Sequence, residues 1–448
     1  MQQHKAFLIL RYNIETTNDL LTSRAGLTSI AQLMQALDLK NTVNQALPKP
    51  KSNRAFAHAD YFNTLILMMH EGSFQLDHVS RLADDTALRT LLELENIPKP
   101  SSLGGWLRRM GTIQFQQPWQ EINKSVLKAT LHNRKAVTLD IDATEIVANK
   151  SSAKWTYKKN KGFMPMVGHI AETGQIVSCD FRHGNTSPAR NNLEFIQQCQ
   201  QALPEGCSVK TLRIDAAGYQ ESIIRYCDEN NICYAIRAVK SAAIKSLIDN
   251  IPPEKWLPFC DKSGEVIENQ YTFRSSHCIG TYEKPFTIVI QRTKISHQQT
   301  LDLGDESSRS DALEMNGFIY RAIATNHDDW ADSEVVHWYN QRGEDSENRI
   351  KELKLDLGGD CLPCSDFEAN GVYFLMTALA YNLLALLREL LPESLSRCRA
   401  PTLRNRLYAM AGKLVKSGRL WTLKVQAMNI ELLQEVTVSL RRFKPLIL

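Results

Sequence analysis

The sequence predicts an α/β protein with a mixed β-sheet, an inserted β-rich subdomain, a helical N-terminal domain and a helical, basic C-terminal region. Three observations predict this class. Apolar residues recur at helical spacing through residues 28–135, short strand-like runs begin at residue 136, and a long apolar helix follows residue 366. The chain has 448 residues of ordinary globular composition, enough for about two to four folding units.

Residues 1–135 are expected to be helical and to bind DNA. The helical pattern covers residues 28–39, 60–70, 77–94, 102–110 and 114–131. The pair of helices joined at residues 96–102 resembles a helix-turn-helix, with Arg108 and Arg109 on its second helix as candidate DNA contacts. Helical hairpins are common, so a purely structural pair is the alternative.

Residues 136–248 predict strands and helices in the order βββαβαβ. Strands are expected over 136–142, 164–171, 175–181, 208–215 and 232–239, with helices over 188–203 and 220–230. Short turns join the first three strands, which should therefore be antiparallel. Alternation with helices favours parallel neighbours for the last two strands.

Residues 249–330 are expected to form the β-rich insertion, with strands over 270–274, 286–292 and 317–325. Residues 331–392 then complete the main domain with a charged helix over 333–355 and an apolar helix over 367–390. The apolar run from 372 to 387 has 16 residues, fewer than the roughly 20 that span a bilayer, which predicts a buried core helix and no membrane partner. Residues 393–448 form the basic C-terminal region.

Charge is unevenly distributed along the chain. The net charge is +4, but residues 1–135 carry +5, residues 386–448 carry +8 and the segment between them carries −9. Basic flanks suit a protein that grips a polyanion such as nucleic acid, although solvated helix faces give the same pattern. The short apolar run after Lys5 does not resemble a signal peptide, so we expect a cytoplasmic, nucleoid-associated protein with reduced cysteines.

Two predicted strands carry carboxylates at positions suited to a shared site. Asp140 and Asp142 alternate with apolar residues and so project from one strand face. Asp215 ends the fourth strand, and ligands gather at such strand ends, although a strand-end Asp is usually only a turn cap. If the first and fourth strands are neighbours, Asp142 and Asp215 meet. Close carboxylates repel each other unless a cation neutralises them, which indicates Mg²⁺ or Mn²⁺.

A third acid lies in the charged helix, at Glu347. With Tyr339, Arg342 and Lys354 around it, and with the two strand acids before it, the pattern resembles the DDE transposases of bacterial insertion sequences, in the subgroup with the Tyr-Arg-Glu-Lys signature. That subgroup has an Asp-x-Thr strand, matched by residues 142–144, and an Arg-x-Asp segment, matched by residues 213–215. The sequence lacks the Gly-x-x-x-x-Gly-Lys, Gly-x-Ser-x-Gly and His-Glu-x-x-His motifs of other enzyme classes.

The resemblance implies a ribonuclease-H-like catalytic core that cleaves DNA and transfers strands during cut-and-paste transposition. It implies that Asp142, Asp215 and Glu347 are catalytic and hold two Mg²⁺ or Mn²⁺ ions. It also implies that Tyr339, Arg342 and Lys354 contact DNA phosphates. Its partners would be the terminal inverted repeats of the element and the target DNA, bound by a homodimer.

One departure from the family signature concerns the spacing of the helix. Four residues, rather than three, separate Arg342 from Glu347. We expect Gly343 to break or delay the helix, so that Arg342 lies on a preceding turn while Glu347 and Lys354 share a face. Glu344 is the alternative third acid and Asp140 the alternative first acid. The rival functions are a nuclease without strand transfer and a catalytically inactive, transposase-derived DNA-binding protein.

Residues 150–161 form a second candidate DNA contact. Lys158 and Lys159 lie among further lysines, and Trp155 and Tyr157 are interleaved with them. Lysines suit phosphate contact and aromatic rings suit base stacking. A solvated loop is the alternative interpretation.

Overall fold

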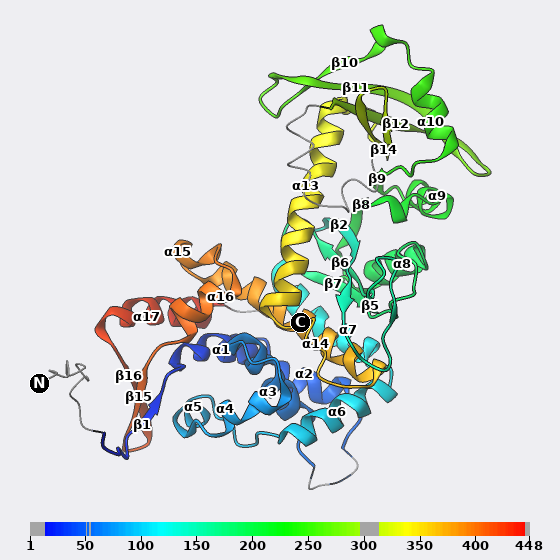
Figure 1. The fold of residues 1–448 in the computed structure, drawn as a ribbon. Helices are drawn as coiled ribbons and strands as arrows, with labels where there is room; N and C mark the ends of the chain where they lie inside the picture. Colours follow the sequence, from blue (N-terminus) through cyan, green and yellow to red (C-terminus); the bar gives the residue numbers. More distant parts are fainter. Residues whose placement is uncertain (1–13, 51, 53–54, 296–312, 444–448) are drawn as a thin grey trace, which may run out of the picture.

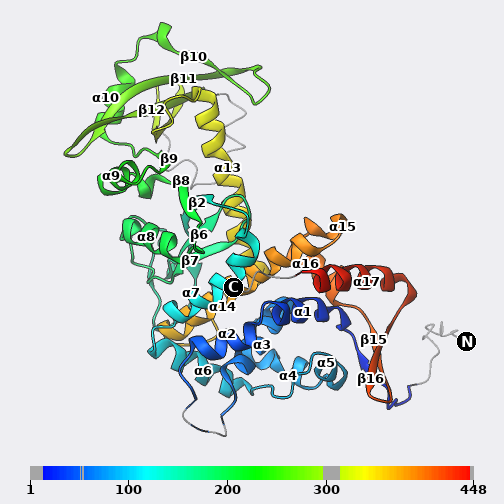
Figure 2. The same ribbon diagram turned by 180° about the vertical axis from the view of Figure 1, so that it is seen from behind.

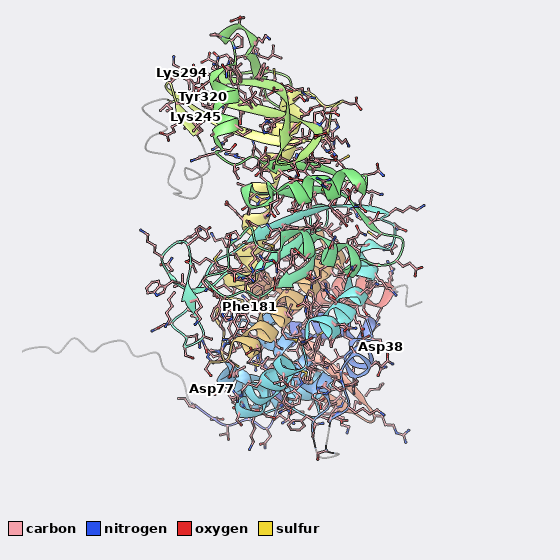
Figure 3. The ribbon with its side chains drawn as sticks, turned by 90° about the vertical axis from the view of Figure 1, so that its right-hand side faces the viewer. Asp38, Asp77, Phe181, Lys245, Lys294 and Tyr320 are labelled. Atoms are coloured by element: carbon pink, nitrogen blue, oxygen red, sulfur yellow. The ribbon has the colours of Figure 1, made fainter. Side chains whose placement is uncertain are left out.

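The computed structural model describes residues 14–50, 52, 55–295 and 313–443. The molecule is elongated, with the N-terminal helices at one end, the insertion at the other and helix α13 (Asp332–Lys351) running between them (Figures 1 and 2). In the side view, Lys245, Lys294 and Tyr320 mark the insertion and Asp38 and Asp77 mark the opposite end (Figure 3).

The central sheet confirms the predicted order of strands and helices. Its five core strands are β2 (Ala136–Ala143), β6 (Met166–Ile170), β7 (Ile176–Asp180), β8 (Ser208–Ile214) and β9 (Cys233–Arg237), arranged in space as β9-β8-β2-β6-β7. The first three strands are antiparallel, and β8 runs parallel to both β2 and β9. Helices α8 (Asn192–Ala202) and α9 (Glu221–Glu229) make the connections. The first and fourth strands are therefore neighbours, as the carboxylate site requires.

The insertion extends this sheet. After α10 (Ala242–Asp249) come strands β10 (Leu257–Cys260), β11 (Val266–Ile279), β12 (Tyr282–Lys294), β13 (Leu313–Met315) and β14 (Phe318–Thr325). Strand β14 pairs antiparallel with β9, so within the described residues all these strands belong to one ten-stranded sheet. Val335, Val336 and Tyr339 of α13 pack on this sheet, which fixes the helix against the insertion.

The N-terminal region is helical, as predicted, but two of its helix boundaries differ from the prediction. Its helices are α1 (Thr28–Ala36), α2 (Leu39–Ala46), α3 (His58–Glu71), α4 (Ser80–Ala83), α5 (Thr86–Leu91), α6 (Pro100–Thr112) and α7 (Gln116–Leu131). Left-handed backbone at Asp38 separates α1 from α2. The expected single helix over 77–94 is wrong, because the Asp85 carboxylate accepts from the Leu88 amide at 2.8 Å and starts a new helix there.

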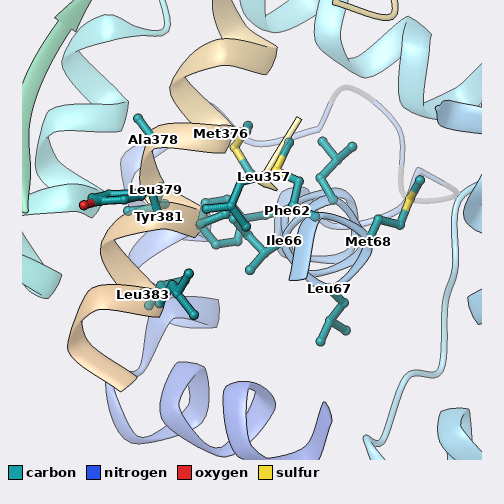
Figure 4. Close-up of a cluster of buried hydrophobic side chains, with 14 of the residues drawn as sticks. Phe62, Ile66, Leu67, Met68, Leu357, Met376, Ala378, Leu379, Tyr381 and Leu383 are labelled. Carbon is teal, nitrogen blue, oxygen red and sulfur yellow. The ribbon is translucent and has the colours of Figure 1, made fainter. Parts of the chain in front are cut away.

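Helix α14 (Phe367–Leu390) is the core helix that the sequence predicts. By length and hydropathy it could cross a membrane, but 89% of its most apolar window is buried inside the protein. It packs against α3, α6 and α7. Phe62 and Ile66 of α3 meet Met376, Leu379 and Leu383 of α14 in one apolar cluster (Figure 4).

The C-terminal region returns to the start of the chain. It contains α15 (Glu393–Ser396), α16 (Ala400–Leu403), β15 (Gly412–Ser417), β16 (Leu420–Val425) and α17 (Ala427–Arg442). Strand β15 pairs with β1 (Leu20–Thr22), and α17 packs on α1. Both ends of the described chain therefore contribute to the same small sheet, β1-β15-β16.

Candidate active site

Two of the predicted carboxylates end neighbouring strands of the central sheet, and the third lies on helix α13. The parallel register pairs Ile141 with Ile214, so Asp142 and Asp215 both lie at the carboxyl ends of neighbouring strands. Burial raises the pKa of Asp142 to about 6. Arg342 opposes this shift, whereas the charges of Asp215 and Glu347 add to it. The fold thus brings both Asp215 and Glu347 within electrostatic range of Asp142.

Helix α13 carries the third acid without any break. It runs continuously from Asp332 to Lys351, so the expectation that Gly343 interrupts it is wrong. One glycine costs a helix only about 1 kcal/mol relative to alanine, and the packing of α13 on the sheet offsets that cost. As a result Arg342 faces inward while Glu347 is exposed. The backbone of Glu344 is helical, but its side chain lies outside the described part of the structure.

The first two residues of the signature point at the carboxylates. The Arg342 side chain is buried, its Nη2 lies 3.6 Å from Oδ1 of Asp142, and it donates to the Ile141 carbonyl. Tyr339 is also buried, and burial raises the pKa of its hydroxyl, with the charge of Arg342 opposing the shift. Contact of Tyr339 and Arg342 with DNA phosphates stays a prediction, and in this structure neither side chain is on the surface.

Lys354, the last residue of the Tyr-Arg-Glu-Lys pattern, is hydrogen-bonded to the residues that follow strand β2. Lys354 lies in the π-helix Glu352–Asp356 that continues α13. Its Nζ donates to Oγ1 of Thr144 at 3.2 Å and to the carbonyl of Glu145. Burial lowers the pKa of Lys354. Lys354 therefore holds Thr144 and Glu145, the residues that directly follow strand β2.

The alternative first acid, Asp140, is committed to a buried ion pair. It is fully buried, and its two oxygens accept from Nε and Nη2 of Arg213 at 2.7 Å each. The same guanidinium donates through Nη1 to the Trp338 carbonyl of α13 at 2.7 Å. Asp140 and Arg213 therefore connect β2, β8 and α13 beneath the carboxylates.

Sequence reasoning missed this supporting layer. Asp140 and Arg213 each lie two residues before a candidate acid, and the strand register places them side by side. The available signal was a negative charge two residues before Asp142 and a positive charge two residues before Asp215. No comparable signal marks His169, which is buried 3.7 Å from Asp140 and 3.2 Å from the hydroxyl of Ser346.

The donor set suits a hard divalent cation. Carboxylate oxygens are the ligands that Mg²⁺ and Mn²⁺ prefer, and a bound cation would offset the repulsion that Asp142 experiences from Asp215 and Glu347. Among the residues that the structure describes, no three His, Cys, Asp or Glu side chains lie close enough together to form a ready metal site. Asp142, Asp215 and Glu347 would therefore have to close around an ion, and the exposed Glu347 has room to turn.

The predicted loop at residues 150–161 forms part of a small sheet, which we call the basic sheet. It consists of β3 (Ile146–Val147), β4 (Lys154–Trp155) and β5 (Lys161–Phe163) in the order β3-β5-β4, and it includes the turn with Lys158 and Lys159. The chain enters this sheet directly after Glu145. The basic sheet is therefore continuous with the strand that carries Asp142.

The candidate DNA contacts of the N-terminal region lie on α6. Trp106 faces the core and is fully buried, whereas Arg108 and Arg109 are exposed. The Arg108 guanidinium lies 3.9 Å from Asp366, and Arg109 lies over the ring of Tyr61 at 5.9 Å. Both arginines are accessible, and their contact with DNA stays a prediction.

Comparison with known proteins places the chain in a family. A family profile described as "Transposase DDE domain group 1" matches residues 11–445, nearly the whole chain. Among solved structures, the piggyBac transposase synaptic complex with hairpin DNA is similar, with 9% sequence identity, a TM-score of 0.47, and coverage of 85% of this chain and 78% of that one. No curated protein matches. Because the family match extends over nearly the whole chain, this chain belongs to the DDE transposases, in the group 1 DDE-domain family.

Proposed function

We propose that this protein is an insertion-sequence transposase that cleaves DNA at the ends of its own element and joins those ends to target DNA by a cut-and-paste route. The observation that carries the proposal is that Asp142 and Asp215 end neighbouring strands and that the charges of Asp215 and Glu347 both act on Asp142. The order of the central strands supports a ribonuclease-H-like core.

Each residue of the site has a part in this reaction. Asp142, Asp215 and Glu347 would hold two Mg²⁺ or Mn²⁺ ions, which when bound activate water or a 3′-hydroxyl and stabilise the leaving oxygen. Arg342 favours the ionised form of Asp142, the form that can bind a cation. Lys354 holds the segment after Asp142 in place, and Arg213 of β8 bonds Asp140 of β2 and so ties the two strands together.

The DNA partners follow from charge and from the reaction itself. The basic ends of the chain, the exposed Arg108 and Arg109, and Lys158 and Lys159 of the basic sheet can neutralise phosphates. Two element ends must be cut and joined together, which supports a homodimer bound to terminal inverted repeats and target DNA. Such a protein works in the cytoplasm, at the nucleoid.

The test is cleavage and strand transfer of labelled DNA that carries the end of the element, with Mg²⁺ or Mn²⁺. We expect metal-dependent cleavage and joining by the wild type. Asp142→Ala, Asp215→Ala and Glu347→Ala should each lower the rate by about a thousandfold or more, because each removes an oxygen ligand. Glu344→Ala is the matched control in the same helix and should keep activity.

Three results would overturn parts of this proposal. Cleavage without joining would indicate a nuclease, and binding without cleavage would indicate an inactive DNA-binding protein. Loss of activity in Glu344→Ala together with activity in Glu347→Ala would move the third ligand to Glu344.

A further inference from the structure

The basic sheet exposes two large aromatic rings. Trp155 is 68% exposed and Tyr157 is 63% exposed, although aromatic side chains of this size are usually largely buried. The same segment carries Lys150, Lys154, Lys158, Lys159 and Lys161, and Nζ of Lys158 lies 5.9 Å from the centre of the Tyr157 ring. An exposed aromatic surface among like charges indicates a binding surface for an anionic, ring-containing partner.

The turn that carries these rings is held firmly. Thr156, between the two aromatic residues, is buried and donates to the Glu145 carboxylate. Asn160 donates to the other oxygen of Glu145 at 3.1 Å. Because Thr156 between them is anchored inward, Trp155 and Tyr157 are exposed on a backbone that needs little reordering on binding.

The basic sheet adjoins the carboxylates. Glu145, whose carboxylate accepts hydrogen bonds from Thr156 and Asn160 of the turn, lies three residues after Asp142. Its carbonyl accepts a hydrogen bond from Lys354. Burial lowers the pKa of Lys354 and the charge of Lys158 adds to that shift, so the turn and Lys354 lie within electrostatic range. A second contact of the basic sheet comes from Ser152, between β3 and β4, which donates to the Ser365 carbonyl at 2.9 Å.

The chemistry of the surface selects its occupant. Lysines bind phosphates of any nucleic acid, but an aromatic ring can stack only on a base whose face is uncovered. In an intact duplex the neighbouring base pairs cover those faces. We propose that Trp155, with Tyr157 beside it, stacks on unpaired bases of a DNA end whose backbone lies on the lysines of the basic sheet. This inference rests on the proposed function, because it takes DNA as the substrate of the adjacent carboxylates.

The test is equilibrium binding of the full-length protein in EDTA, so that no catalysis is required. The probes are a blunt duplex and the same duplex with a few unpaired nucleotides at its end, labelled there with 2-aminopurine. We expect the wild type to bind the frayed end about tenfold more tightly and to quench the 2-aminopurine. Trp155→Ala should remove this preference while blunt-duplex affinity stays unchanged, and Trp155→Phe should restore most of it.

Trp421 offers a matched control. It is 42% exposed on β16, with the ammonium of Lys416 5.3 Å from its ring centre, and it lies in the other small sheet. Trp421→Ala should leave the preference intact. A preference that persists in Trp155→Ala, or equal loss of blunt and frayed binding, would overturn the inference. If the frayed-end preference depends on Trp155 but the wild type neither cleaves nor joins DNA, the inference stands and the proposed function fails.

Discussion

At the scale of single residues, the pair of Asp140 and Arg213 explains how the acids above it keep their positions. The guanidinium bonds both oxygens of Asp140, donates to α13 and lies 5.2 Å from the centre of the Trp338 ring. A buried ion pair adds little stability by itself, but removing one partner leaves an uncompensated charge. Arg213 is therefore a positioning residue for Asp142 and Asp215, each two residues further along its strand.

The first prediction concerns this pair. Arg213→Ala should lower the free energy of unfolding by roughly 3–5 kcal/mol, because Asp140 would remain buried without its partner. The measurement is denaturant unfolding followed by circular dichroism. Arg225→Ala is the control, because its ion pair with Glu221 is a surface i,i+4 pair, and its unfolding midpoint should hardly change. Equal shifts in the two variants would contradict the role of Arg213.

The site could be predicted only in part from the sequence. Strand alternation and strand order sufficed to bring Asp142 and Asp215 together, since both follow from local patterns. The partner of Arg342 could not be predicted, because it depends on how α13 docks on the sheet. The extra residue before Glu347 led to a wrong expectation at Gly343, since the packing of the whole helix outweighs one weak helix former.

At the scale of elements, α13 is one continuous helix that extends from the insertion to the candidate acids. Its inward face places Tyr339, Arg342, Ser346 and Arg349 at three-to-four spacing, and Arg349 donates to the carbonyls of Ile170 and Ala171. At about 100° per residue, Glu347 falls beside this inward face rather than within it. One continuous helix therefore connects the insertion to the third acid.

The second prediction tests the continuity of α13. A Cβ at Gly343 would meet nothing within 4 Å, so Gly343→Ala should raise the free energy of unfolding by roughly 0.5–1 kcal/mol. Gly111→Ala is the helical control, because a Cβ there would lie 2.8 Å from Cβ of Glu368 and should destabilise α6 against α14. Both effects can be read from thermal unfolding. Destabilisation by Gly343→Ala would show that the helix is not continuous there.

Helices and strands with regularly spaced apolar residues were predictable from the sequence, and elements that depend on pairing with distant segments were not. The core strands and α14 follow from runs of apolar residues with a regular spacing. Strand β1 has only three residues and exists because β15 pairs with it from almost 400 positions away. The pairing of β14 with β9, which makes the insertion part of the main sheet, is equally invisible in a local pattern.

At the scale of the whole molecule, segments far apart in the sequence share one hydrophobic core. Residues of the N-terminal helices, of α14 and of the C-terminal region pack in a single cluster. Within it, Nδ1 of His70 lies 3.1 Å from the hydroxyl of Tyr408. The core therefore depends on the protonation state of a buried histidine as well as on apolar packing.

The third prediction is a loss of stability in mild acid. Burial lowers the pKa of His70 to about 3, with the charge of Arg404 adding to the shift, whereas an unfolded histidine has a pKa near 6.5. Below that pH the unfolded state binds more protons, so stability falls as pH drops. His70 should account for a loss of about 2 kcal/mol between pH 7 and pH 5. Urea unfolding of wild type and His70→Gln at both pH values measures this, and identical pH dependence in the two would contradict it.

The shared sheet of β1 and β15 also has a consequence for the growing polypeptide. The N-terminal helices emerge from the ribosome first, but α14 and β15, which complete their packing, follow roughly 250 to 300 residues later. At about 5–20 residues per second, this wait lasts on the order of 15–60 s. A chain truncated before α14 would contain the N-terminal helices without their central partner, so it should not yield a stably folded fragment.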